Sequence, residues 1–265
     1  MPNSQNGVQL SVAGKVALVT GGSRGIGAAT VRMFCAAGAK VAFNYQKAKA
    51  AADRVVEECG TDVCAIQSEL SSSQDAEKLL KTVVGNFGRL DCLIANHGIW
   101  PPNDAPIDQM SDEQWRQTIA VNLDSVFGLI KHSVAQMKRQ GRSQGQAAGR
   151  IVIISSTAGQ RGEAFHCDYA ASKGAVISMV KGLSTELARD GIYVNCVAPG
   201  WVATDMAAPA LEDRQTRDRI FATIPLGRVG KPEEIAAPIL FLCTEHSGFI
   251  TGEILNVNGG AVLVG

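Results

Sequence analysis

The segment at residues 15–37 constrains the fold more than any other part of this chain. Residues 15–20 form a short apolar run typical of a buried strand, and a turn with glycines at positions 21, 25 and 27 follows at once. Residues 28–37 have helical character and end at Gly38, a typical helix C-cap. This arrangement favours a dinucleotide cradle, because glycines let the backbone approach a pyrophosphate and the helix N-terminus offers free N–H groups. The GxxxGxG spacing differs from the commoner GxGxxG, and the alternative is a simple tight turn.

Strand and helix patterns alternate along the rest of the chain. Further strands are predicted at residues 40–44, 62–66, 90–95, 151–154, 193–198 and 253–257, and helices at 50–59, 74–87, from about 111, around 169–173 and at 232–243. This alternation predicts an α/β fold, a single-domain Rossmann fold with a parallel sheet. We expect residues 1–13 to be a flexible tail, 14–265 to be the domain, and about 201–223 to be a mobile lid.

Composition limits the class of partner. Lys plus Arg and Asp plus Glu number 25 each, so net charge gives no reason to expect binding to nucleic acid or a membrane, and a small-molecule substrate fits better. No window approaches the ~18 apolar residues of a membrane span. The seven cysteines form no CxxC pair and no Cys–His cluster. We therefore expect no metal site, and reduced thiols in a cytoplasmic protein.

The stretch from residue 151 to 173 carries the candidate chemistry. Four β-branched residues end at Ser155-Ser156-Thr157, where a parallel strand reaches the edge of its sheet. Tyr169 and Lys173 stand four residues apart and share one helix face. A nearby ammonium favours the phenolate, so we expect a lowered Tyr169 pKa and an acid/base role, with Ser156 bonding the same substrate oxygen. The alternative is that Tyr169 is a core residue and Lys173 a solvated charge.

The charge around the second predicted strand indicates which dinucleotide binds. A site that prefers NAD usually has a carboxylate about twenty residues beyond the glycines, to bind the ribose 2′-OH. Here no acid precedes Asp53, whereas Arg24 lies in the glycine turn and Lys47 follows the second strand. We therefore predict NADP(H) as the preferred cofactor, with NAD(H) as the alternative if both cations are ordinary surface charges.

Three other side chains admit two interpretations each. Asn122 lies in an apolar run, so it either supports a helix bulge with a satisfied amide or orders water near the site. Trp100 and Trp201 each follow a turn at the predicted sheet edge. They either line an apolar substrate pocket or only pack their loops.

The motifs together resemble the short-chain dehydrogenase/reductase family over nearly all of the chain from Gly14 onward. The matching motifs are Thr20-Gly-Gly-Ser-Arg-Gly-Ile-Gly27, Asn122, Ser156, Tyr169-Ala-Ala-Ser-Lys173, Pro199-Gly200 with Thr204, and Asn258-Gly-Gly260. The run at 224–234 and Ile250-Thr-Gly resemble the branch that includes 3-oxoacyl-acyl-carrier-protein reductases. The resemblance implies a doubly wound, seven-stranded parallel sheet with helices on both faces, a homotetramer, and hydride transfer between nicotinamide and a carbonyl or alcohol carbon.

The resemblance also implies a role for each matched residue. Tyr169 would be the general acid in reduction, Ser156 would polarise the carbonyl, Lys173 would lower the Tyr169 pKa and bind the nicotinamide ribose, and Asn122 would hold a relay water. Thr204 matches the position that contacts the nicotinamide carboxamide. The implied cofactor contacts are Gly21, Ser23, Arg24, Gly25, Ile26, Gly27, Tyr45, Lys47, Glu69, Leu70, Asn96, Gly98, Tyr169, Lys173, Pro199, Gly200, Val202 and Thr204.

Several positions depart from the family pattern. The family's Asn-Asn-Ala-Gly turn reads Ala95-Asn96-His97-Gly98, and Glu69 stands where an Asp near adenine is usual. Carrier-protein reductases have basic docking residues where this chain has Ala147 and Asp190, so Arg142 or Arg189 would have to substitute.

Three functions therefore stay open. One is reduction of an acyl thioester, and another is oxidation or reduction of a free cyclic, aromatic or sugar-like alcohol or ketone. The third is a dinucleotide-binding sensor without catalysis, although a sensor has no need of the Tyr169 and Lys173 pair.

Overall fold

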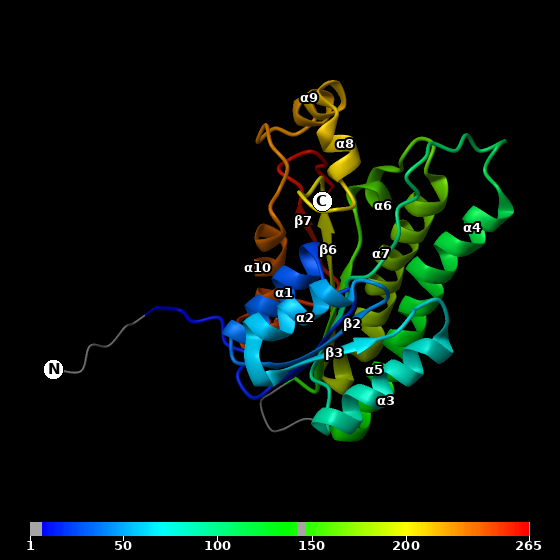
Figure 1. Cartoon of the computed structure of the whole chain (residues 1–265). Helices are drawn as coiled ribbons and strands as arrows, with labels where there is room; N and C mark the ends of the chain where they lie inside the picture. Colours follow the sequence, from blue (N-terminus) through cyan, green and yellow to red (C-terminus); the bar gives the residue numbers. More distant parts are fainter. Residues whose placement is uncertain (1–6, 142–146, 265) are drawn as a thin grey trace.

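The architecture is a seven-stranded parallel sheet, seen in a computed structural model that describes residues 7–141 and 147–264. The strand order is β3-β2-β1-β4-β5-β6-β7 (Figure 1). The strands are β1 (Val16–Val19), β2 (Lys40–Tyr45), β3 (Val63–Gln67), β4 (Cys92–Ala95), β5 (Gly149–Ile154), β6 (Ile192–Pro199) and β7 (Ile254–Val257). The order reverses between β1 and β4, and this switch point is where open α/β sheets bind ligands.

Helices cover both faces of the sheet. They are α1 (Gly25–Ala36), α2 (Lys49–Cys59), α3 (Ser73–Phe87), α4 (Asp112–Ile119), α5 (Ser125–Gln140), α6 (Thr157–Arg161), α7 (Cys167–Leu187), α8 (Ala208–Glu212), α9 (Arg214–Ala222) and α10 (Pro232–Cys243), with short segments η1 (Gly60–Asp62), η2 (Ala120–Asp124), η3 (Ala188–Asp190) and η4 (Glu245–Ser247). One core cluster lies under α1, α2 and α10, and the other lies under α3, α5 and α7 (Figure 1). The central strands are buried on both faces, which explains their continuous apolar runs.

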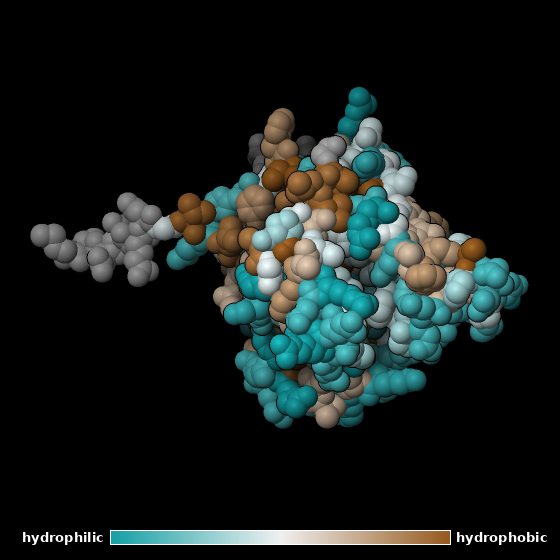
Figure 2. Space-filling model, turned by 90° about the horizontal axis from the view of Figure 1, so that it is seen from above, coloured by the Kyte–Doolittle hydropathy of each residue, from teal (hydrophilic) through white to brown (hydrophobic). Residues whose placement is uncertain are grey.

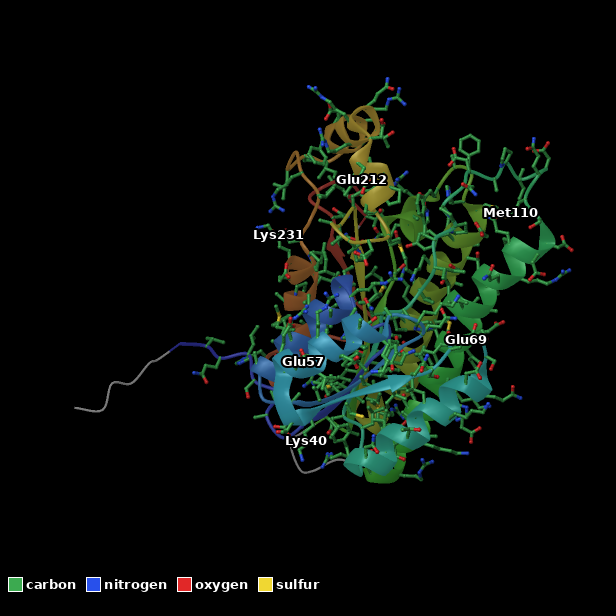
Figure 3. All side chains as sticks on the ribbon, viewed as in Figure 1. Lys40, Glu57, Glu69, Met110, Glu212 and Lys231 are labelled. Atoms are coloured by element: carbon green, nitrogen blue, oxygen red, sulfur yellow. The ribbon has the colours of Figure 1, made fainter. Side chains whose placement is uncertain are left out.

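The carboxyl edge of the sheet lies at the top of the molecule. Figure 3 shows Lys40, the first residue of β2, at the bottom, whereas Glu212 on α8 lies at the top. Figure 2 looks down on the molecule from above and shows hydrophobic residues gathered in one part of this face, with hydrophilic residues over much of the rest. The loops that follow the strands meet at this edge, so it can hold a site built from several segments.

The predicted fold class is confirmed, with local differences. Helix α1 begins at Gly25 rather than at 28, so the glycine turn itself forms the first helical turn. Val12, assigned to the tail, is only 2% exposed and its amide donates to Ala37 O at 3.1 Å. Residues 201–223 contain α8 and α9, which the sequence pattern did not predict. In the described ranges, no helix is long and apolar enough to cross a membrane.

Candidate active site

A single cavity of about 780 Å³ collects nearly all of the predicted site residues. Its lining contains every predicted cofactor contact together with Ser156, whereas Asn122 lies behind the wall and is 1% exposed. Most of these residues follow the carboxyl ends of β1 to β6, and Tyr169 and Lys173 lie on α7. The sequence motifs therefore converge in space, which is a precondition for the roles implied above.

The glycine turn has the shape of a phosphate-binding loop. Gly21 has a φ of +66°, and a Cβ at Gly27 would lie 2.1 Å from Gly21 O, so neither position has room for a larger residue. Asn44 Oδ1 accepts from Gly21 N at 2.9 Å, and Asn96 Nδ2 donates to Thr20 O at 2.8 Å. Because the turn runs directly into the N-terminus of α1, its residues fit a dinucleotide pyrophosphate.

The end of the cavity predicted to hold adenosine has no carboxylate directly after β2. Tyr45, Gln46 and Lys47 line it there, and Asp53 is paired with Lys49 at 2.8 Å on the exposed face of α2. Glu69, which stands where the family has an Asp near adenine, and Leu70, another predicted cofactor contact, line the cavity after β3. The charge at the end of β2 is therefore positive, as the sequence indicated.

The catalytic candidates come from β5 and α7. Lys173 is 5% exposed, and its Nζ donates to Ile154 O at 2.9 Å and lies 5.8 Å from the centre of the Tyr169 ring. Ser155 Oγ donates to Lys173 O at 2.8 Å, which fixes the end of the strand against the helix. Ser156 hydrogen-bonds to Tyr169, and its Oγ accepts from Ala158 N at 3.1 Å as the N-cap of α6.

The pKa of Tyr169 corrects one prediction. Burial raises this pKa to about 12, because the phenolate would lose its hydration. The hydrogen bond from Ser156 lowers the pKa and the charge of Glu163 raises it, whereas Lys173 points its amine at Ile154 O. Burial also lowers the pKa of Lys173 to about 8. The expected lowering of the phenol pKa by Lys173 is therefore wrong for this arrangement, because burial is the largest cause of the shift and the charge of Glu163 acts in the same direction.

Asn122 supports a bulge in the helix, as one of its two interpretations predicted. It lies in the π-helical segment η2 between α4 and α5. Its Oδ1 accepts from Ile99 N at 2.8 Å, and its Nδ2 donates to Ile99 O at 2.9 Å and to Ser172 Oγ at 3.2 Å. The side-chain amide is thus satisfied by the protein and holds the loop after β4 against α7.

The side chain of His97 links two segments of the fold, a role that the sequence did not reveal. Its Nδ1 lies 2.8 Å from Thr20 Oγ1 and its Nε2 lies 2.6 Å from Ser125 Oγ. Ser125 Oγ donates to Val121 O at 2.7 Å, so it accepts from Nε2–H, and Nδ1 accepts from Thr20. Burial and the charge of Lys173 lower the His97 pKa to about 3. A neutral imidazole therefore joins the end of β1 to the helix bulge.

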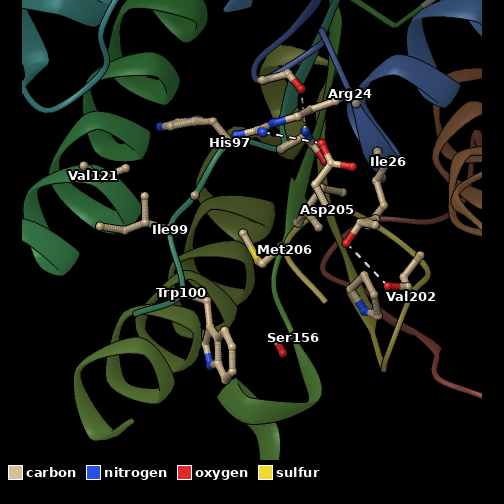
Figure 4. Close-up of a pocket in the computed structure, with 18 of the residues that line it drawn as sticks. Arg24, Ile26, His97, Ile99, Trp100, Val121, Ser156, Val202, Asp205 and Met206 are labelled. Atoms are coloured by element: carbon tan, nitrogen blue, oxygen red, sulfur yellow. Dashed lines mark hydrogen bonds and ion pairs between the residues drawn. The ribbon is translucent and has the colours of Figure 1, made fainter. Parts of the chain in front are cut away.

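The far end of the cavity is aromatic and charged. Trp100 and Trp201 meet edge to face with ring centres 6.3 Å apart, and Trp100 stacks on His166 at 4.6 Å. Figure 4 shows Trp100 near Ser156 in the pocket. Arg161 and Glu163 line the same cavity. Sequence reasoning missed both charges, although their place between Ser156 and Tyr169 was a usable signal.

The carrier-docking candidates lie away from this cavity. Asp190 is paired with Lys138 at 2.6 Å, and Arg189 is exposed beside it at the end of α7. Ala147 precedes β5, so it lies at the amino edge of the sheet, opposite Ser156. Arg142 lies outside the described residues.

Comparisons with known proteins agree with this geometry. A family model described as enoyl-(acyl carrier protein) reductase matches residues 21–262. A 3-oxoacyl-[acyl-carrier-protein] reductase from Synechocystis sp. is 40% identical over 253 residues, which cover 94% of this chain and 97% of that protein. The chain belongs to the short-chain dehydrogenase/reductase family.

Solved structures place the fold in the same family. One is described as a short-chain dehydrogenase/reductase, glucose/ribitol dehydrogenase, from Brucella melitensis; it is 34% identical with a TM-score of 0.87 and covers 97% of this chain and 100% of its own. Another is a 3-ketoacyl-(acyl-carrier-protein) reductase from Brucella melitensis complexed with NADH. It is 30% identical with a TM-score of 0.86, and the match covers 96% of this chain and 100% of that chain. As a member of this family, the chain is an NAD(P)-dependent oxidoreductase acting on carbonyl or alcohol groups.

Proposed function

We propose that this enzyme reduces a ketone to a secondary alcohol with NADPH. The observation that carries the proposal is the convergence of Ser156, Tyr169 and Lys173 in one cavity with a glycine loop and the cations Arg24 and Lys47. A free 2′-hydroxyl would find no carboxylate directly after β2, whereas a 2′-phosphate would find positive charge. NAD(H) remains the alternative cofactor.

The chain's own residues supply the proton chemistry. Ser156 Oγ accepts from Ala158 N, and its hydroxyl bonds to Tyr169. A substrate carbonyl oxygen that enters between the two hydroxyls would take the proton of Ser156 in place of that bond. Tyr169, whose pKa is raised, stays protonated near neutral pH and delivers its proton to that oxygen. Lys173, beside the phenol, would bind the ribose hydroxyls of the cofactor. Thr204 lies against the glycine turn, because a Cβ at Gly25 would come within 3.1 Å of its side chain. When bound, the nicotinamide supplies the hydride.

Two substrate classes remain candidates. The relatives' names support a 3-oxoacyl thioester. A free cyclic, aromatic or sugar-like ketone is favoured by the Trp100 and Trp201 corner, and by Asp190 and Ala147 at positions where carrier docking would need bases.

The assembly and its location belong to the same proposal. We propose that the enzyme is a homotetramer, because large hydrophobic side chains stay exposed on α4 and α5, with Trp115 at 41% and Phe127 at 51%. We also propose that it is cytoplasmic, because its seven cysteines are free thiols. Light scattering coupled to size exclusion tests the tetramer directly. A stable monomer at micromolar concentration would contradict it.

The function is tested by following nicotinamide absorbance with NADPH and NADH against a ketone panel that includes acetoacetyl thioesters. We expect Tyr169→Phe to lower turnover by at least about 100-fold, because the proton donor is lost. Near wild-type turnover in Tyr169→Phe would refute the assigned acid. Tight NADPH binding with no turnover of any ketone or alcohol would instead favour the non-catalytic sensor.

A further inference from the structure

Trp100 and Trp201 form an aromatic corner in the wall of the cavity, and His166 holds this corner in place. His166 is 3% exposed and its Nε2 lies 2.9 Å from Pro101 O, so its ring is held in place. Trp100 stacks on that ring with an interplanar angle of 13°, and Trp201 meets Trp100 at 78°. The two indoles come from loops after β4 and β6, and both line the cavity. A rigid indole surface suits a flat or ring-shaped ligand better than a flexible chain.

Two charged side chains stand at the same end. Arg161 ends α6 and Glu163 follows it, and both line the cavity. Glu163 is half-buried, which raises the pKa of its carboxyl, and it is hydrogen-bonded to Trp100. The negative charge of Glu163 also raises the pKa of Tyr169, so the carboxylate and the phenol interact electrostatically. Glu163 therefore offers a hydrogen-bond acceptor in the same cavity as Ser156 and Tyr169.

The indole surface and the Glu163 carboxylate favour a cyclic ketone over an acyl thioester. An acyl chain would cover the half-buried carboxylate of Glu163 without offering it a hydrogen-bond donor beyond Trp100, and removing water from a carboxylate that lacks a replacement donor is costly. A hydroxyl on the carbon next to the carbonyl can donate to Glu163 while the ring lies against Trp100. We infer that the substrate is a compact cyclic ketone with a hydroxyl beside the carbonyl, bound by Glu163 and the Trp100–Trp201 corner. This inference rests on the ketone reduction proposed above.

The test compares 2-hydroxycyclohexanone, cyclohexanone and an acetoacetyl thioester of N-acetylcysteamine as substrates with NADPH. We expect kcat/KM for the hydroxyketone to exceed that for cyclohexanone by at least about 10-fold, because a site built for a hydroxyl rejects the analogue without it. The thioester should be the poorest of the three. Glu163→Leu should reduce the hydroxyl preference to about 2-fold or less, and Glu163→Gln, which keeps an acceptor oxygen, should retain part of it.

The control is Glu212→Gln, an exposed carboxylate on α8 outside the cavity, which should keep the full preference. Equal rates for the two cyclic ketones, a preference for the thioester, or an unchanged preference in Glu163→Leu would each overturn the inference while leaving ketone reduction intact. No turnover of any ketone would instead refute the proposed function itself, and the inference with it.

Discussion

The guanidinium of Arg24 lies 3.4 Å from the carboxylate of Asp205, across 181 positions of the sequence. Arg24 belongs to the glycine turn and Asp205 to the segment predicted to act as a lid, and Figure 4 shows the two side chains, which both line the cavity, joined by a dashed line. Both side chains are exposed, at 65% and 69%. The cation assigned to the 2′-phosphate is therefore shared with the lid segment.

Replacing Arg24 should separate the two cofactors. Arg24→Ala should weaken NADPH binding by about 10-fold or more, because a hydrogen bond between charged groups contributes about 1.5–3 kcal/mol. NADH should lose less than about 3-fold. Fluorescence titration of both dinucleotides measures the two dissociation constants. Equal losses would show that Arg24 does not contact the 2′-phosphate.

Asp205→Asn should act in the opposite direction. Removing the carboxylate frees Arg24, and an exposed ion pair contributes only about 0.2–1 kcal/mol, so NADPH should bind up to about 5-fold more tightly. NADH should be little affected. Asp218→Asn on α9, also exposed, is the matched control. An unchanged ratio of NADPH to NADH affinity in Asp205→Asn would mean that the pair does not compete with the phosphate.

His97 should make the fold sensitive to acid. Its pKa is about 3 in the folded protein against an ordinary value of 6.5, so the unfolded chain binds the proton first. This stabilisation is complete above pH 6.5, is lost as the pH falls from 6.5 to 3, and amounts to a few kcal/mol in order of magnitude. His97→Gln should flatten the pH dependence of urea unfolding in that range. His246→Gln, at an exposed position, should leave it unchanged.

Asn122 should be important for stability. Asn122→Ala would leave the half-buried N–H and C=O of Ile99 without their side-chain partner, which costs about 2–3 kcal/mol of unfolding free energy. Urea unfolding at neutral pH measures the loss, with Asn86→Ala on the exposed face of α3 as the control. A loss below about 0.5 kcal/mol would show that water replaces the amide.

Lys173 should set the alkaline limit of activity. With a pKa of about 8, its ammonium loses the proton above that pH, so the positive charge proposed to bind the ribose hydroxyls beside the phenol disappears. We expect kcat/KM for reduction to fall about tenfold per pH unit above pH 8.

The residual activity of Lys173→Arg should lack this fall, because arginine stays protonated. Lys181→Arg, exposed on the same helix, should keep it. A wild-type profile that stays flat well above pH 8 would contradict the assignment to Lys173.

Local patterns in the sequence predicted much of the fold and the membership of the site. The capping pattern at Ser111 predicted the start of α4, where Ser111 Oγ accepts from Gln114 N at 3.1 Å. Helix α1 was predicted to begin three residues too late, because glycine has a low helix propensity, although the glycine turn in fact forms the first turn of this helix. Helix α8 was missed because its five residues, which include Pro209, are too few to show a helical period. Helix α9 was missed because its sequence is rich in charged residues and only weakly amphipathic.

The sequence by itself determined the elements that depend on spacing along the chain. These are the strand, glycine turn and helix at 15–37, and the Tyr169 and Lys173 pair, whose separation of four residues places both on one helix face. Only the tertiary structure decided the properties that depend on burial and distant contacts. It raised the pKa of Tyr169, joined Arg24 to Asp205, and brought Trp100, His166 and Trp201 together with Glu163. Desolvation and contacts between remote segments exist only once the sheet has aligned its loops, so no local pattern encodes them.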